Sequence, residues 1–129
     1  MATLQLKGKI FSGKGEGTKY MQLQWAKTQI TRKLGFIPYN GTLNIKLTEE
    51  SIKTKKQLES ANATEITPQN GFCRAICFPA LLNENVKCAL LIPEIADYPE
   101  DVAEIIASTN LKKELHLKDG DQIQVTVLL

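Results

Sequence analysis

The sequence lacks the features that mark several large classes of protein. It contains no apolar run near the roughly 20 residues that span a bilayer, and its N-terminus, MATLQLKGKIF, lacks the apolar centre of a signal peptide. Only one histidine and three cysteines occur among its 129 residues. We therefore expect a cytoplasmic protein with reduced thiols and no association with a membrane.

The cysteines Cys73, Cys77 and Cys88 include no C-x-x-C pair, and His116 is the only histidine that could join them at a metal. On a strand, Cys73 and Cys77 leave the same face, which predicts that they are small buried hydrophobic residues. The spacing thus argues against a thiolate metal centre.

A strong excess of one charge is also missing. Sixteen basic and fourteen acidic side chains give a net charge of +2, whereas nucleic-acid binders usually carry a marked basic patch. The densest basic cluster, Lys53, Lys55 and Lys56, is typical of one solvated helix face. We expect no nucleic-acid partner.

The pattern of short apolar segments predicts one domain that is mainly β, a small barrel with a few short helices. Neither a repeat nor a linker interrupts the sequence. Alternating or apolar segments predict strands over residues 4–13, 41–47, 65–67, 72–78, 86–92 and 122–129. Helical spacing and end signals predict helices over residues 19–35, 48–60, 99–107 and 109–117, with Thr48 and Thr109 as N-caps and Gly35 as a C-cap.

The stretch SGKGEG, residues 12–17, nearly matches two phosphate-binding motifs. Gly15 stands where a P-loop needs Ser or Thr, and Thr18 stands where the dinucleotide fingerprint needs its third glycine. Successive glycine amides before a helix can still form an anion-binding nest. A tight turn between a strand and a helix explains the same residues, and the stretch by itself leaves both interpretations open.

Thr42 and Asn44 are two residues apart at the start of a predicted strand, so their side chains leave the same face. A hydroxyl and a carboxamide oxygen suit Mg²⁺ when water and phosphate complete the coordination. Taken alone, these side chains are more typical of groups that satisfy the backbone of a turn.

In this order and spacing, SGKGEG, LGFIPYNGTLNIKL, EIIA and LKKELHLKDGD resemble the archaeal CTP-dependent riboflavin kinases, over about Gly8 to Val127. The block LGFIPYNGTLN carries the most specific part of the likeness. The resemblance implies a six-stranded cradle-loop barrel. The chain is too short for the N-terminal helix-turn-helix domain of some members, so we expect residues 1–129 to form a single riboflavin-kinase-like domain.

The resemblance also implies site residues, none of which follows from spacing alone. Thr42 and Asn44 match the pair that holds Mg²⁺. Glu104 matches a flavin contact, although by itself it would be taken as a solvated helix carboxylate, and Ala96 stands on the flavin side where the family usually has threonine. The implied nucleotide contacts are Gly13, Lys14, Gly15, Glu16, Gly17, Thr18, Thr109, Asn110, Leu111 and Lys112.

The implied reaction transfers the γ-phosphoryl group of CTP to the 5′-hydroxyl of riboflavin, giving FMN and CDP, and we expect the enzyme to be a monomer. The general base is unknown from sequence, with Glu104 a weak candidate. Two alternatives remain: a nucleotide- or flavin-binding barrel without turnover, suggested by Ala96 and by Lys112 in place of arginine, and a DNA-binding cradle-loop regulator. Trp25 is expected in the core, and Tyr39 is open between a turn and a stacking role.

Overall fold

The computed structural model describes residues 2–13, 19, 21–69 and 71–129. Within the described residues it has seven strands and three helices, and every pairing between these strands is antiparallel. In chain order they are β1 (Thr3–Phe11), α2 (Gln24–Leu34), β2 (Leu43–Leu47), α3 (Glu49–Leu58), β3 (Thr64–Ile66), β4 (Ala75–Leu82), β5 (Val86–Pro93), β6 (Val102–Ile106), α4 (Leu111–Glu114) and β7 (Gln122–Leu128).

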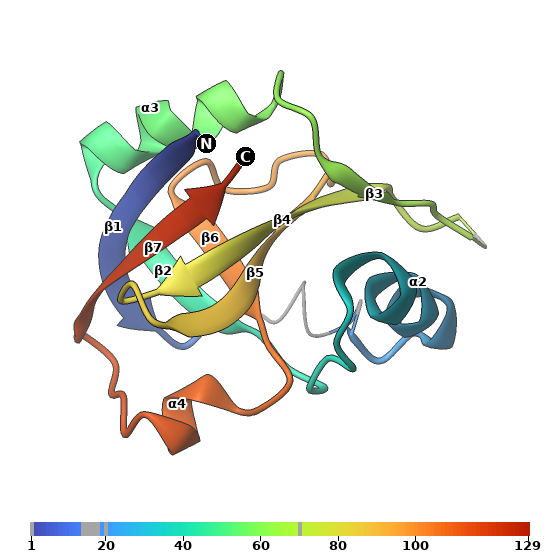
Figure 1. Ribbon diagram of the computed structural model, residues 1–129. Helices are drawn as coiled ribbons and strands as arrows, with labels where there is room; N and C mark the ends of the chain where they lie inside the picture. Colours follow the sequence, from blue (N-terminus) through green and yellow to red (C-terminus); the bar gives the residue numbers. More distant parts are fainter. Residues whose placement is uncertain (1, 14–18, 20, 70) are drawn as a thin grey trace.

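Six of the strands close into a barrel. The order β4-β5-β6-β2-β1-β7 returns to β4, because Ala80–Leu82 of β4 pair with Val125–Val127 of β7. The first residues of β4, Ala75–Cys77, pair instead with β3, which lies outside the closed ring. The predicted six-stranded barrel is therefore confirmed, with β3 as an added strand. Figure 1 shows α3 at the end of the barrel near both termini, α4 at the opposite end and α2 beside β3 and β5.

Apolar side chains at alternate positions of the strands fill the inside of the barrel. Leu6 and Ile10 of β1 are buried with Phe78 of β4 and Ile105 of β6 in one apolar cluster. Successive strand residues point to opposite faces, so every second side chain enters this cluster. Leu6 and Ile10 thus lie on the inward face of the first strand.

Helix α2 covers the outer face of the barrel. Ala26 and Ile30 pack there with Cys77 of β4 and Leu91 of β5, and Trp25 is half-buried against this second cluster, as predicted. Gly35 ends the helix with a φ of 83°, so the predicted C-cap is confirmed. The start predicted near residues 18–20 falls largely outside the described residues, and α2 itself begins at Gln24.

The burial predicted for Cys73 and Cys77 is confirmed for Cys77 and is wrong for Cys73. Cys77 and Cys88 are buried, and burial raises the pKa of each thiol to about 12. Cys73 precedes β4 and is exposed, because that strand begins at Ala75 rather than at residue 72.

Helix α3 begins as predicted at the Thr48 cap, whose side chain accepts a hydrogen bond from the Ser51 amide. The prediction that Lys53, Lys55 and Lys56 form one solvated helix face is wrong for Lys55. Lys55 is only 7% exposed, and its ammonium donates to the Val102 carbonyl at 2.8 Å. The lysine therefore joins α3 to the start of β6.

The helix predicted over residues 99–107 is wrong. Residues Val102–Ile106 form β6, which pairs with β2 and β5, and all five side chains are buried. A run buried on both faces lacks a polar helical face, and a strand is the element that accommodates it here. Glu100 and Asp101 lie in the preceding turn, where they pair with Lys56 and Lys46 at 3.0 Å each.

The second predicted N-cap is shifted by one residue. Asn110, not Thr109, caps α4, because its side-chain oxygen accepts from the Lys113 amide at 3.2 Å. Among the described residues no helix is both long and apolar enough to cross a membrane.

Candidate functional site

Two cavities adjoin where β1 ends and β2 begins. The first, which we call the α4 cavity, has a volume of about 350 Å³. It lies between the end of β1, the loop before β2 and the start of α4. The second, which we call the Tyr98 cavity, measures about 340 Å³ and is lined on one side by residues 95–99. Phe11, Gly13 and Asn44 line both cavities and form the border between them.

At this border the main chain of Gly13 passes directly against the side chain of Asn44. A Cβ at residue 13 would lie 2.7 Å from the Cγ and 2.8 Å from the Oδ1 of Asn44. Because contacts this short do not occur for real side chains, the arrangement requires glycine. The first glycine of SGKGEG thus sets how closely that loop approaches β2.

Glu104 lies beside the same border. It is opposite Asn44 in the pairing of β2 with β6, and its side chain is 1% exposed. Thr42 donates from Oγ1 to one carboxylate oxygen at 2.8 Å, and the Tyr98 hydroxyl donates to the other at 2.5 Å. These two hydrogen bonds offset part of the cost of burying the carboxylate.

The structure groups the described predicted residues around the two cavities. Gly13, Thr42, Asn44 and the segment Thr109–Lys112 line the α4 cavity, whereas Ala96 and Glu104 line the Tyr98 cavity. The remaining predicted contacts, Lys14, Gly15, Glu16, Gly17 and Thr18, lie outside the described residues. Tyr39 also lines the α4 cavity and is exposed, and its hydroxyl accepts from Asn110 at 3.3 Å.

Sequence reasoning missed a polar cluster between the glycine loop and α4. The carboxylate of Asp119 accepts from the Ser12 hydroxyl at 2.7 Å and from the Lys112 ammonium at 2.7 Å. Both hydrogen bonds lower the pKa of Asp119, and the one from Lys112 has the larger effect. This carboxylate therefore joins two segments that line the α4 cavity, and its position in a Lys-Asp-Gly-Asp turn carried no signal of that contact.

Tyr98 was also missed. The sequence predicted a helix from residue 99 and did not predict the turn before it, in which Tyr98 lies. The Tyr98 amide donates to the Ile95 carbonyl at 3.1 Å, and Asp97 takes a φ of 63° between them. This is a compact turn in which an aspartate occupies the left-handed region, which Asp and Asn tolerate better than most residues.

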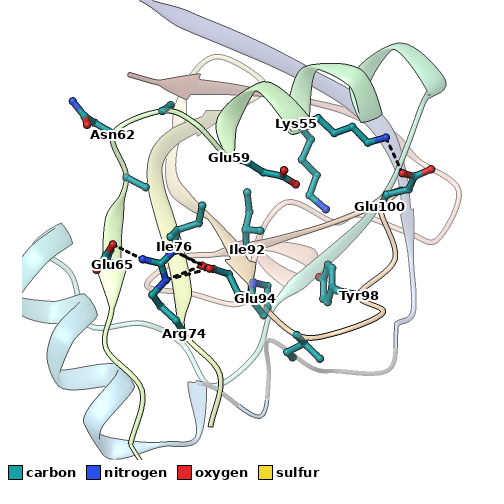
Figure 2. A pocket seen from close by; sticks show the side chains of 15 residues that line it. Lys55, Glu59, Asn62, Glu65, Arg74, Ile76, Ile92, Glu94, Tyr98 and Glu100 are labelled. Carbon is teal, nitrogen blue, oxygen red and sulfur yellow. Dashed lines mark hydrogen bonds and ion pairs between the residues drawn. The ribbon is translucent and has the colours of Figure 1, made fainter.

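A third and larger cavity, which we call the α3 cavity, opens between α3 and the strands β3 to β5 and measures about 620 Å³. Several of its charged side chains are paired: Arg74 contacts Glu65 and Glu94 (Figure 2), and Lys56 contacts Glu100. The α3 cavity shares Ile95 and Tyr98 with the Tyr98 cavity. It contains none of the predicted site residues.

Comparison with known proteins decides the family. The matching family model, CTP-dep_RFKase, is described as "Domain of unknown function DUF120" and covers residues 10–127. The chain belongs to the CTP-dependent riboflavin kinase family. The resemblance inferred from SGKGEG and LGFIPYNGTLN is thereby confirmed.

Individual relatives named riboflavin kinase occur in several archaea. The chain is 35% identical to the protein of Archaeoglobus fulgidus, over 98% of this chain and 56% of the relative. It is 37% identical to that of Methanoregula boonei, over 95% and 56%, and 38% identical to that of Ignicoccus hospitalis, over 96% and 71%. The chain therefore spans little more than half the length of the first two relatives.

The family resemblance implies a Mg²⁺ ion, and the side chains of Thr42 and Asn44 have the chemistry to bind one. The described residues hold no cluster of three or more His, Cys, Asp or Glu side chains that could bind a metal by themselves. The half-buried side chains of Thr42 and Asn44 offer a hydroxyl and an amide oxygen at the α4 cavity, and the Glu104 carboxylate touches that hydroxyl. Hard oxygen donors of this kind suit Mg²⁺ when phosphate oxygens supply further ligands.

Proposed function

We propose that this family member transfers the γ-phosphoryl group of CTP to the 5′-hydroxyl of riboflavin, giving FMN and CDP. The observation that carries the proposal is the shared border of the two cavities. Residues with implied nucleotide roles line one cavity, and residues with implied flavin roles line the other. A donor and an acceptor bound on the two sides would meet beside Gly13 and Asn44.

In the proposed reaction the 5′-oxygen of riboflavin forms a bond to the γ-phosphorus. The bond from that phosphorus to the bridging oxygen of CTP breaks, CDP leaves, and the hydroxyl proton is released. Such transfers depend mostly on positioning and on stabilisation of charge. The α4 cavity would hold the nucleotide, through the glycine loop and the segment Thr109–Lys112.

Thr42 and Asn44 would hold Mg²⁺, which when bound neutralises charge on the phosphate oxygens. Glu104 would orient riboflavin from the Tyr98 cavity. Its contact with Thr42 supports a role at the border, because one carboxylate then lines the flavin side and touches one of the two proposed metal ligands. The general base remains unassigned.

The test is an assay of purified protein with riboflavin, Mg²⁺ and either CTP or ATP, scored for FMN. We expect FMN with CTP and little with ATP. No FMN with any nucleotide at high enzyme concentration would overturn the kinase proposal, and retained riboflavin binding would then favour the barrel without turnover. FMN from ATP alone would overturn the donor assignment. Specific binding of duplex DNA without FMN formation would instead support the regulator.

The metal proposal is tested by the double variant Thr42→Ala, Asn44→Ala. We expect FMN formation to fall by about 100-fold or more, because metal coordination supplies several kcal/mol of charge stabilisation. The affinity for CTP, measured by titration, should also lose its dependence on Mg²⁺. Thr54→Ala changes a half-buried residue of α3 that lines neither of the two cavities, so it serves as the control and should leave both measurements unchanged. Full activity of the double variant would contradict the assignment.

A further inference from the structure

The hydroxyl of Tyr98 has no part in the proposed reaction, yet it makes one of the two hydrogen bonds described above to the buried carboxylate of the site. We propose that Tyr98 is a positioning residue, which fixes the Glu104 carboxylate in the orientation that receives riboflavin. This inference rests on the proposed function and assigns a role to a side chain beyond the implied contacts.

The first argument is the way Glu104 is held. Its two oxygens are bound from two different segments, by Thr42 just before β2 and by Tyr98 in the turn before β6. One hydrogen bond leaves a carboxylate able to rotate about its terminal torsion, which is broad in glutamate. A donor on each oxygen removes that freedom, so both the place and the plane of the carboxylate are set.

The second argument is that Tyr98 is itself held on several sides. Its amide closes the turn from Ile95, and its ring lies 5.1 Å from the ammonium of Lys55. Figure 2 shows the end of the Lys55 side chain directed toward that ring from α3. The same ammonium donates to the Val102 carbonyl. Helix α3 thus supports the turn from behind, on the side of the α3 cavity.

The third argument concerns which substrate should respond. Tyr98 lines the Tyr98 cavity and not the α4 cavity, whereas the implied nucleotide contacts line the α4 cavity. Loss of the Tyr98 hydroxyl should therefore weaken the use of riboflavin and spare the use of CTP. General loosening of the fold would affect both substrates.

The primary test is Tyr98→Phe, which removes only the hydroxyl. We expect kcat/KM for riboflavin to fall roughly 10- to 100-fold, the size expected for a hydrogen bond to a charged group. The KM for CTP should stay within about threefold. Tyr39→Phe makes the same chemical change in the α4 cavity, so it should leave the KM for riboflavin within the same limit. Thermal unfolding of each variant reports whether the fold is retained.

A double-mutant cycle then tests whether Tyr98 acts through Glu104. In the Glu104→Gln background we expect Tyr98→Phe to change kcat/KM for riboflavin by less than about threefold, because residues that act as a unit are not additive. Quenching of flavin fluorescence measures riboflavin binding in the same four proteins, without turnover, and should follow the same pattern.

Three outcomes separate the possibilities. Wild-type protein that makes no FMN overturns the proposed function, and this inference with it. Wild-type activity with an unchanged Tyr98→Phe, or with effects that simply add to those of Glu104→Gln, overturns the inference alone. If Tyr98→Phe lowers kcat/KM for both substrates equally, the side chain is structural and the inference is also wrong.

Discussion

At the scale of single residues, the contact between Gly13 and Asn44 leaves no room for a side chain at residue 13. The implied metal ligand Asn44 lies against a main chain that has no space for a Cβ. The glycine of SGKGEG therefore acts through its missing side chain, independently of any role of the loop in phosphate binding.

We predict that Gly13→Ala lowers FMN formation at least about tenfold, because the new methyl group must displace the Asn44 side chain. The effect on stability should be smaller than the effect on turnover. Gly35→Ala is the matched control, since it places a Cβ in open space at a φ of 83° away from both cavities. It should cost about 1 kcal/mol of unfolding free energy with normal activity per folded molecule. Equal activity in the two variants would contradict the steric argument.

Lys55 makes a prediction about pH. Desolvation lowers the pKa of its ammonium, although the charges of Glu59, Asp101, Glu100 and Glu104 oppose that shift. Between the lowered folded pKa and the ordinary value of 10.5, the unfolded chain binds more protons than the folded one. Stability from this residue therefore rises with pH across that window and is lower below it.

Urea unfolding of wild type and Lys55→Met at several alkaline pH values measures this contribution. We expect the wild type to gain stability relative to the variant as the pH rises toward 10.5. If the difference in unfolding free energy between the two proteins does not depend on pH, burial does not lower the pKa of this lysine.

At the scale of elements, the segment 99–107 shows where reasoning from local sequence failed. Pro99 followed by two acidic residues is typical of a first helical turn, yet residues Val102–Ile106 form a central strand. The tertiary surroundings decide this, because β6 pairs with β2 and β5 on its two edges and packing on both faces of the sheet buries every one of its side chains. The same error placed Glu104 on a solvated helix, when it is among the most buried charged side chains described.

Helix α3 offers a prediction in which the same change, threonine to alanine, has different effects on stability at two positions. Thr48→Ala removes the cap that accepts from Ser51 and should cost about 1 kcal/mol of unfolding free energy. Thr54→Ala lies inside the helix, where its hydroxyl donates only to the Glu50 carbonyl. It should be neutral or gain up to about 0.5 kcal/mol, since alanine is the better helix former. Urea unfolding of both variants checks the pair, and equal losses would contradict the assigned cap.

At the scale of the whole molecule, β7 closes the barrel. Val127 pairs with Leu4 of β1 and with Ala80 of β4, and its side chain is fully buried. The C-terminal strand thereby joins the two ends of the sheet and completes the wall around the inner core.

We predict that Val127→Ala lowers the free energy of unfolding by about 2 to 3 kcal/mol, through the lost burial of two methyl groups and the cavity they leave. Thr126→Ala changes the next residue, which is half-buried on the other face, and should cost less than about 1 kcal/mol. Chemical denaturation with a spectroscopic probe measures both. If Thr126→Ala lost more unfolding free energy than Val127→Ala, the assignment of Val127 to the core face of β7 would be wrong.

The sequence by itself determined the class of fold, the limits of most strands and the family. These properties depend on alternation, on end signals such as Thr48 and Gly35, and on local blocks such as LGFIPYNGTLN. The family resemblance also implied the candidate residues that line the α4 cavity. Only the tertiary structure brought Glu104 to Thr42 and Tyr98, and Asp119 to Ser12 and Lys112. The reason is physical: these contacts join segments from different strands and turns, and barrel closure rather than local propensity determines which of them meet.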